Sequence, residues 1–270
     1  MHHANDCEHH CDCDYVDHSA NEHAPTQSEA AFYAAISRDL ELLALLHDRE
    51  PTVELIEALR EADQGGWFGL KATSQTTQRG SELLAAALAA MPRPPAQETL
   101  DELAVDFANI YLVHAYRAPP TESPWLDQDK LERQQPMFDL AEWYRRHGLA
   151  AADRQVRSDD HLVLQLQFLS HLFAHTHHGN AAAEAARFMD AHILRWFGRF
   201  SEIVAARCMT PYYAGLVTLT EGYLEDLREY LVKLTDAPRP VEVVKEQVTS
   251  ADYGVEPEQT RYIPGVTPSW

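Results

Sequence analysis

Apolar residues recur every three or four positions along most of the chain between residues 28 and 234. Near the start of this stretch, Phe32, Ile36, Leu40 and Leu43 fall on one face of a helix. The sequence shows no pair of alternating segments joined by a hairpin turn, and no internal repeat is evident. The pattern therefore predicts an all-α protein, a single-domain bundle of about nine helices with short connections.

Prolines, glycines and capping residues predict where these helices begin and end. Thr99 and Glu102 have the spacing of a capping box, Pro136 suits a first helical turn, and Gly148 suits a helix end. Ser158, followed by two aspartates, is the predicted start of another helix. The predicted helices occupy roughly residues 28–50, 53–64, 81–91, 99–117, 136–147, 158–178, 180–197, 200–209 and 211–234.

The two ends of the chain differ in composition from residues 28–236, which we expect to form the helical domain. Residues 1–27 hold almost nothing apolar, so they are predicted to be a disordered head rich in Cys and His. Residues 237–270 contain several prolines together with Gly254 and Gly265, and are predicted to form an extended tail.

The charge balance limits the possible partners. The chain has 22 Lys and Arg against 42 Asp and Glu, a formal net charge of -20. Such a surface repels nucleic acid phosphates, and it favours either a basic partner or simply solubility. No apolar run approaches the roughly 20 residues that span a bilayer, and the polar N-terminus does not have the order of a secretory signal. We therefore expect a cytoplasmic protein with no stable membrane insertion.

The common catalytic signatures are missing from the sequence. There is no Walker A loop, no dinucleotide-binding glycine motif, no nucleophile elbow and no zinc-protease helix, and only 11 glycines are available for phosphate-binding loops. An acid–base pair such as Glu122 with His161 is conceivable, but the spacing alone does not bring the two together. The sequence thus favours a binding protein over an enzyme.

The head is the one place where the sequence suggests a metal. Thiolates and imidazoles coordinate Zn²⁺ and other soft ions, and here they stand at high density but at no standard zinc-module spacing. The candidate ligands are Cys7, His9, His10, Cys11 and Cys13. A metal-carrying protein is therefore an alternative hypothesis, a solvated tail is the other interpretation of the head, and no cofactor is required elsewhere. Elemental analysis with and without residues 1–24 would separate these hypotheses.

Three segments carry a more specific pattern. Residues 106–112 form the bulky end of a predicted helix, and residues 119–127 form a Pro-flanked loop with a carboxylate, a hydroxyl and an indole. Residues 159–169 open a helix with Asp-Asp-His and continue apolar. The order resembles the TorD/DmsD/NarJ family of molybdoenzyme chaperones, which combines an aromatic-rich helix, a Pro-Pro-x-Glu-Ser loop and a Pro-Asp-His-Leu helix start. Here Asp159 stands where the family has Pro, and Gln165 where Glu is common.

The resemblance covers most of residues 28–235 and implies a cytoplasmic chaperone, not an enzyme. Such a chaperone binds the N-terminal leader and the apo form of the catalytic subunit of a molybdenum-containing oxidoreductase. The positions that the resemblance assigns to leader binding are Phe107, Ile110, Tyr111, Pro119, Pro120, Glu122, Ser123, Trp125, Asp160 and His161. The helical spacing of the first three also suits core packing, and Asp160 and His161 also suit a helix start. A loop has less need of Glu122, Ser123 and Trp125 for packing, which favours a binding role for them.

Overall fold

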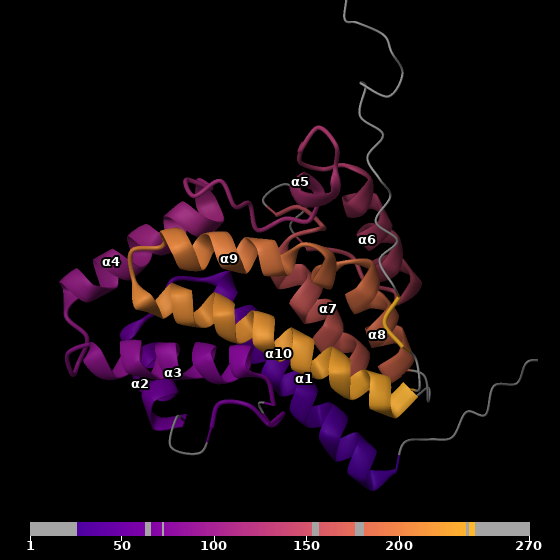
Figure 1. The fold of residues 1–270 in the computed structure, drawn as a ribbon, viewed down its shortest axis with the longest axis horizontal. Coiled ribbons are helices and arrows are strands. Elements are labelled where there is room, and N and C mark those ends of the chain that lie inside the picture. Colours follow the sequence, from indigo (N-terminus) through magenta and orange to yellow (C-terminus); the bar gives the residue numbers. More distant parts are fainter. Residues whose placement is uncertain are drawn as a thin grey trace, which may run out of the picture. The chain divides into compact units, whose positions relative to one another are not determined.

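Figure 1 shows the fold in a computed structural model that describes residues 26–62, 66–71, 73–152, 157–175, 181–235 and 238–240. Within these ranges the chain forms helices and no strand, which confirms the predicted all-α class. The α-helices are α1 (Gln27–Asp48), α2 (Val53–Ala62), α3 (Gln75–Ala90), α4 (Gln97–Phe107), α5 (Ser123–Leu126), α6 (Gln135–Arg146), α7 (Leu162–Ala174), α8 (Ala181–Ala191), α9 (Phe197–Arg207) and α10 (Pro211–Thr235). A π-helical turn, η1 (Ala108–Leu112), extends α4, and a 3₁₀ turn, η2 (Ile193–Arg195), follows α8.

All of these helices belong to one unit, Met1–Pro238. The remainder, Arg239–Trp270, forms a second unit, and the predicted tail falls almost wholly outside the described residues, as do residues 1–25 of the predicted head. None of the described helices is both long and apolar enough to cross a membrane.

The core is organised around α10, the longest helix. Along its length α10 packs against α3 and α9, while α1 packs along α7 (Figure 1). Both faces of α10 are covered, because Tyr212, Leu216 and Tyr223 are all buried and helical spacing places them around much of the helix. Helix α10 therefore contributes buried side chains to the core from most of its circumference.

Glycines let α3 and α10 approach almost backbone to backbone. A Cβ atom on Gly80 of α3 would lie 2.2 Å from the backbone nitrogen of Leu219 on α10. In the opposite direction, a Cβ on Gly222 of α10 would lie 2.3 Å from the nitrogen of Thr77. No side chain larger than hydrogen fits at either position without moving a helix.

A carboxylate of α10 holds the beginning of α3. The Asp226 oxygens accept bonds from the backbone nitrogens of Thr73 (3.1 Å) and Ser74 (3.0 Å) and from the hydroxyl of Thr77 (2.6 Å). These bonds satisfy groups at a helix start that would otherwise lack partners. The sequence pattern placed this start at Ser81, six residues too late, although the N-cap is the local Ser74, whose hydroxyl accepts the Thr77 nitrogen at 3.1 Å.

Two other predicted boundaries are wrong. Helix α4 begins at Gln97, so Thr99 and Glu102 are already inside it and form no capping box. Helix α7 begins at Leu162 with His161 as its N-cap, not at Ser158. The reason is local: the Ser158 hydroxyl donates to Asp160 at 2.5 Å, which holds these residues in a turn ahead of the helix.

The close contact of α3 with α10 yields a stability prediction. Gly80→Ala should lower the free energy of unfolding by about 3 kcal/mol, because the added methyl group meets backbone that cannot rotate away. Gly198→Ala, in α9, is the matched control, since its Cβ would meet only the end of the Glu221 side chain at 3.4 Å. Urea unfolding of both variants measures the difference. Equal stability of the two variants would contradict the backbone contact.

Candidate functional site

Two of the three segments that carry the family pattern, residues 119–127 and 159–169, lie side by side, although about 40 residues separate them in the chain. Thr121 and His161 form an isolated antiparallel bridge. On either side of it, the Glu122 nitrogen donates to the Asp160 carbonyl at 3.1 Å, and the Leu162 nitrogen donates to the Pro120 carbonyl at 2.8 Å. The Pro-flanked loop is thereby tied to the start of α7.

The Asp160 side chain strengthens this junction from within. It is fully buried and accepts the Ser123 nitrogen at 2.8 Å, the Ser123 hydroxyl at 2.5 Å and the Ser158 hydroxyl at 2.5 Å. The Ser123 hydroxyl in turn accepts the nitrogen of Gln134 at 3.1 Å. Hydrogen bonds to a charged acceptor are stronger than neutral ones. The Asp160 carboxylate thus ties the turn at Ser158 to the loop at Ser123, and Ser123 extends the connection to Gln134.

Glu122 is also buried, with 1% of its surface exposed. One carboxylate oxygen accepts the Gln165 amide at 3.1 Å, and the other lies 3.0 Å from Nδ1 of His192. Burial raises the pKa of Glu122 above its usual 4.5, and the hydrogen bond and charge of His192 partly offset this. Gln165, where the family commonly has Glu, supplies an N–H donor to a carboxylate that a second carboxylate would repel.

These contacts correct one part of the sequence reasoning. Glu122 and Ser123 do not project from a free loop, because both are buried and satisfied by the protein's own groups. Trp125 is half-buried, donates its indole N–H to the Pro119 carbonyl at 2.9 Å and stacks near Trp196. The loop therefore does need these side chains to hold its shape. Leader binding by any of them stays a prediction.

A cleft of about 290 Å³ opens beside the junction, and we call it the His161 cleft. Its walls come from the end of α1, from α4 with η1, from the connections on either side of α5, and from the turn before α7. The lining residues are His47, Asp48, Phe107, Tyr111, Leu112, His114, Thr121, Glu132, Arg133, Arg157, Ser158 and His161. Three of the predicted leader-binding residues, Phe107, Tyr111 and His161, thus meet in one place.

The polar floor of the His161 cleft has a defined hydrogen-bond direction. The Thr220 hydroxyl donates to the Leu216 carbonyl, so it accepts from Nε2–H of His47 at 2.9 Å. Nδ1 of His47 is left to accept from the Tyr111 hydroxyl at 2.6 Å. Burial lowers the pKa of His47 to about 3, so the ring is neutral at pH 7.

His161 presents a donor to the cleft. Its Nδ1 accepts the Val163 nitrogen at 3.2 Å, which caps α7. Burial also lowers the pKa of His161 to about 3, so the ring is neutral and its single proton sits on Nε2. A neutral N–H in a cleft is suited to the carbonyl oxygen of a bound chain.

The backbone around the cleft is unusual. Tyr111 and Leu112 belong to the π-helical turn, a geometry that often marks functional sites. Among the described residues, every non-glycine with positive φ lies in the two connections next to α5: His114, Arg117, Lys130 and Arg133. Left-handed backbone at such residues costs energy and persists where the surrounding structure demands it.

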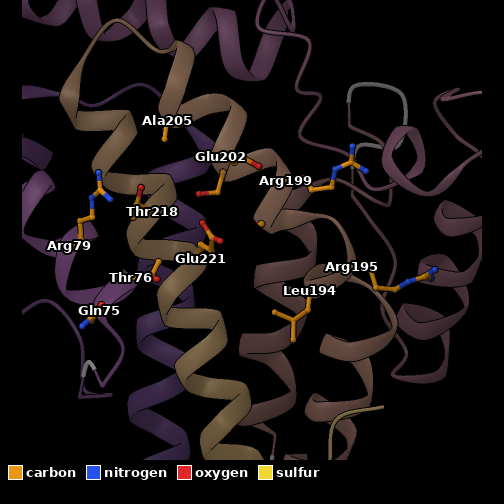
Figure 2. A pocket seen from close by; sticks show the side chains of 12 residues that line it. Gln75, Thr76, Arg79, Leu194, Arg195, Arg199, Glu202, Ala205, Thr218 and Glu221 are labelled. Atoms are coloured by element: carbon orange, nitrogen blue, oxygen red, sulfur yellow. The ribbon is translucent and has the colours of Figure 1, made fainter. Parts of the chain in front are cut away.

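Glu122 faces a different cleft of about 500 Å³, which is also lined by Trp143, His192 and Arg195. Ile110, Pro119, Pro120, Ser123, Trp125 and Asp160 line neither cleft. The ten predicted leader-binding residues are thus divided: three line the His161 cleft, Glu122 lines the second cleft, and the other six line neither. A third hollow of about 670 Å³ lies between α3, α9 and α10 and holds none of the predicted residues (Figure 2). Its centre is acidic, with Glu202 and Glu221 turned toward one another (Figure 2).

Sequence reasoning missed the α1 side of the His161 cleft. His47 and Asp48 lie at the end of α1, whose apolar pattern predicts only core packing. That they line the cleft is visible only in the three-dimensional structure. Arg157 was missed because nothing in its surroundings in sequence points to Asp48, 109 residues away.

The metal prediction for Cys7, His9, His10, Cys11 and Cys13 lies outside the described residues. Within those the structure describes, no group of three or more His, Cys, Asp or Glu is arranged to hold a metal ion. His171 and His175 stack their rings with centroids 4.0 Å apart. Burial raises the pKa of the Cys208 thiol to about 11, as suits a packed rather than a reactive thiol.

The described residues thus form an all-helical fold with several surface clefts. Residues 72–202 match the family model described as nitrate reductase delta subunit. The chain also aligns with proteins named chaperone protein TorD. It is 28% identical over 132 residues to the one from Aliivibrio fischeri, covering 46% of this chain and 61% of that protein.

Two further relatives carry the same name. The Psychrobacter sp. protein is 27% identical over 154 residues, covering 53% of this chain and 68% of the relative. A Vibrio cholerae protein is 30% identical over 146 residues, covering 51% and 66%. The alignment spans only about three fifths of the Aliivibrio fischeri protein. Together these matches confirm the resemblance to the TorD/DmsD/NarJ family that the motifs predicted.

The buried carboxylate predicts a stability effect. Asp160→Ala should lower the free energy of unfolding by about 3 kcal/mol, because it leaves Ser123 and Ser158 donors buried without an acceptor. Asp139→Ala, on the exposed face of α6, is the control and should change it by less than about 0.5 kcal/mol. Chemical unfolding gives both values. An Asp160→Ala variant as stable as the control would contradict the supporting role.

The depressed pKa of His161 predicts a pH effect. Below about pH 6.5 the unfolded chain takes up a proton that folded His161 refuses until about pH 3, so stability present above 6.5 is lost as the pH falls through this window. At about pH 5 the loss should be about 2 kcal/mol. His161→Asn keeps a capping side chain and should reduce the stability loss between about pH 7.5 and pH 5 by that amount. The measurement is the free energy of unfolding as a function of pH for the wild type and His161→Asn. An equal loss of stability in both proteins between about pH 7.5 and pH 5 would contradict the lowered pKa of His161.

Proposed function

We propose that the chain is a cytoplasmic maturation chaperone for a molybdenum-containing oxidoreductase of the dimethyl-sulfoxide-reductase type. It binds the N-terminal leader and the apo form of the catalytic subunit until the cofactor is inserted and, where relevant, until export. The observation that carries this proposal is the similarity of about half of the chain to proteins that are named chaperones, together with the match to the family model. That class is not enzymatic, in agreement with the absence of catalytic signatures from the sequence.

The His161 cleft is the proposed leader site. A leader is an extended chain with an apolar stretch and basic residues, and the cleft offers a surface for each part. Phe107 and Leu112 provide apolar wall, and Leu112 keeps 62% of its surface exposed. His161 provides the N–H donor, and Asp48 and Glu132 provide carboxylates.

The overall charge supports a basic partner. A protein with a formal net charge of -20 attracts a leader that carries arginines and speeds the encounter at low salt. The acidic composition by itself is equally consistent with solubility alone. Under this proposal it also attracts the basic residues of the leader.

Leader binding predicts that Leu112→Ser weakens the complex without unfolding the protein. The substitution removes an exposed apolar contact of the cleft, and it should reduce affinity for the client leader about three- to tenfold. Leu131→Ser is the matched control, because Leu131 is similarly exposed but does not line the cleft. Titration with the leader of the subunit that copurifies from cytoplasm measures both. Failure to copurify any molybdoenzyme subunit and to bind its leader would reject the function.

A further inference from the structure

Two residues that line the His161 cleft form an ion pair of the protein itself. Nη1 of Arg157 lies 2.6 Å from Oδ1 of Asp48, and the pair links the turn before α7 to the last residue of α1. Both partners line the cleft, and both are partly exposed, with 31% of the Arg157 side chain and 23% of the Asp48 side chain accessible. Solvent, and hence a ligand, can reach this contact.

The end of α1 is a place that favours a cation. Helix C-termini carry partial negative charge and leave their last carbonyls without partners inside the helix. Asp48 adds a full negative charge at this end, where a carboxylate is unfavourable unless a cation is near. Burial raises the pKa of Asp48, but hydrogen bonds from Arg157 and Arg49 outweigh it and hold the pKa below 3.8. The position therefore attracts a guanidinium strongly.

The other carboxylate of the cleft is less committed. Glu132 lies 3.7 Å from His114 and is 46% exposed, whereas Asp48 sits deeper and holds its arginine at hydrogen-bond distance. A basic residue of a bound chain that enters the cleft meets Asp48 as the anchoring acceptor, and finds it already occupied by Arg157. The apolar wall at Leu112 lies in the same cleft and takes residues adjacent to that basic residue.

We propose that Arg157 is a built-in competitor that occupies the arginine subsite of the His161 cleft, and that an arginine of the client displaces it from Asp48. The proposal rests on the proposed function, and it adds a means of regulation: binding requires exchange of one guanidinium for another. Such exchange weakens binding of chains that supply only apolar residues, because these cannot replace the broken ion pair.

A purely structural role of the pair makes the opposite prediction. If Arg157 only holds the turn before α7 in place, then Arg157→Ala loosens the cleft wall and weakens binding. If Arg157 competes with the client, then Arg157→Ala frees Oδ1 of Asp48, while Arg49 stays 3.0 Å from Oδ2, and binding tightens. The sign of the change in affinity therefore separates the two roles.

The test uses two fluorescent synthetic peptides and the full chain. One peptide has an Arg-Arg pair before a stretch rich in leucine and alanine, and the other has Gln-Gln in place of the arginines. Arg157→Ala should tighten binding of the Arg-Arg peptide roughly two- to fivefold, the range of a partly exposed ion pair, and leave the Gln-Gln peptide unchanged. The gain should shrink at high salt and vanish in Arg157→Ala with Asp48→Asn.

Arg145→Ala is the matched control, because it removes an ion-paired arginine, changes the net charge equally and lies outside the cleft. It should leave both affinities as they are, and thermal unfolding confirms that all variants fold. If the wild type binds the Arg-Arg peptide and Arg157→Ala weakens this binding or leaves it unchanged, the competitor role is wrong. Leader binding itself would not be contradicted by that result. Absence of binding of either peptide by wild type and variant alike would overturn both.

Discussion

The buried carboxylate of Asp160 is the interaction on which the site depends. It collects bonds from Ser123 and Ser158 and so holds the Pro-flanked loop against the turn that precedes α7. Without this acceptor the bridge of Thr121 with His161 loses its support, and the cleft beside it loses one wall. A charge in the interior is costly unless fully hydrogen-bonded, and here each oxygen has a partner. The two sequence segments that resemble the family, the Pro-flanked loop and the start of α7, therefore shape the His161 cleft.

Helical periodicity was enough to predict the all-α class, because it records which face of each helix is buried. Helix boundaries were predicted less well: α3 begins after Ser74, its local N-cap, and the Asp226 carboxylate of α10 holds the residues that lead into it. The start of α7 was misplaced for a related reason: Ser158 and Asp160 bond to the loop and to one another instead of continuing a helix. Local sequence shows capping residues but not what they cap.

The candidate site was predicted in part. Phe107, Tyr111 and His161 share one cleft, although core packing alone also accounted for their spacing. Glu122 and Ser123 were expected to be free because they lie in a loop, and burial shows that expectation to be wrong. The cleft-lining carboxylate Asp48 was not predicted, because its relation to the signature segments exists only in three dimensions.

The matched region of the family model begins at residue 72, whereas α1 ends at Asp48. The His161 cleft is consequently composed of two parts: most of its lining lies within the matched region, whereas His47 and Asp48 come from the end of α1, ahead of it. Under the proposed function, substitutions at the end of α1 would change the preference for a client while the junction around Asp160 stays intact.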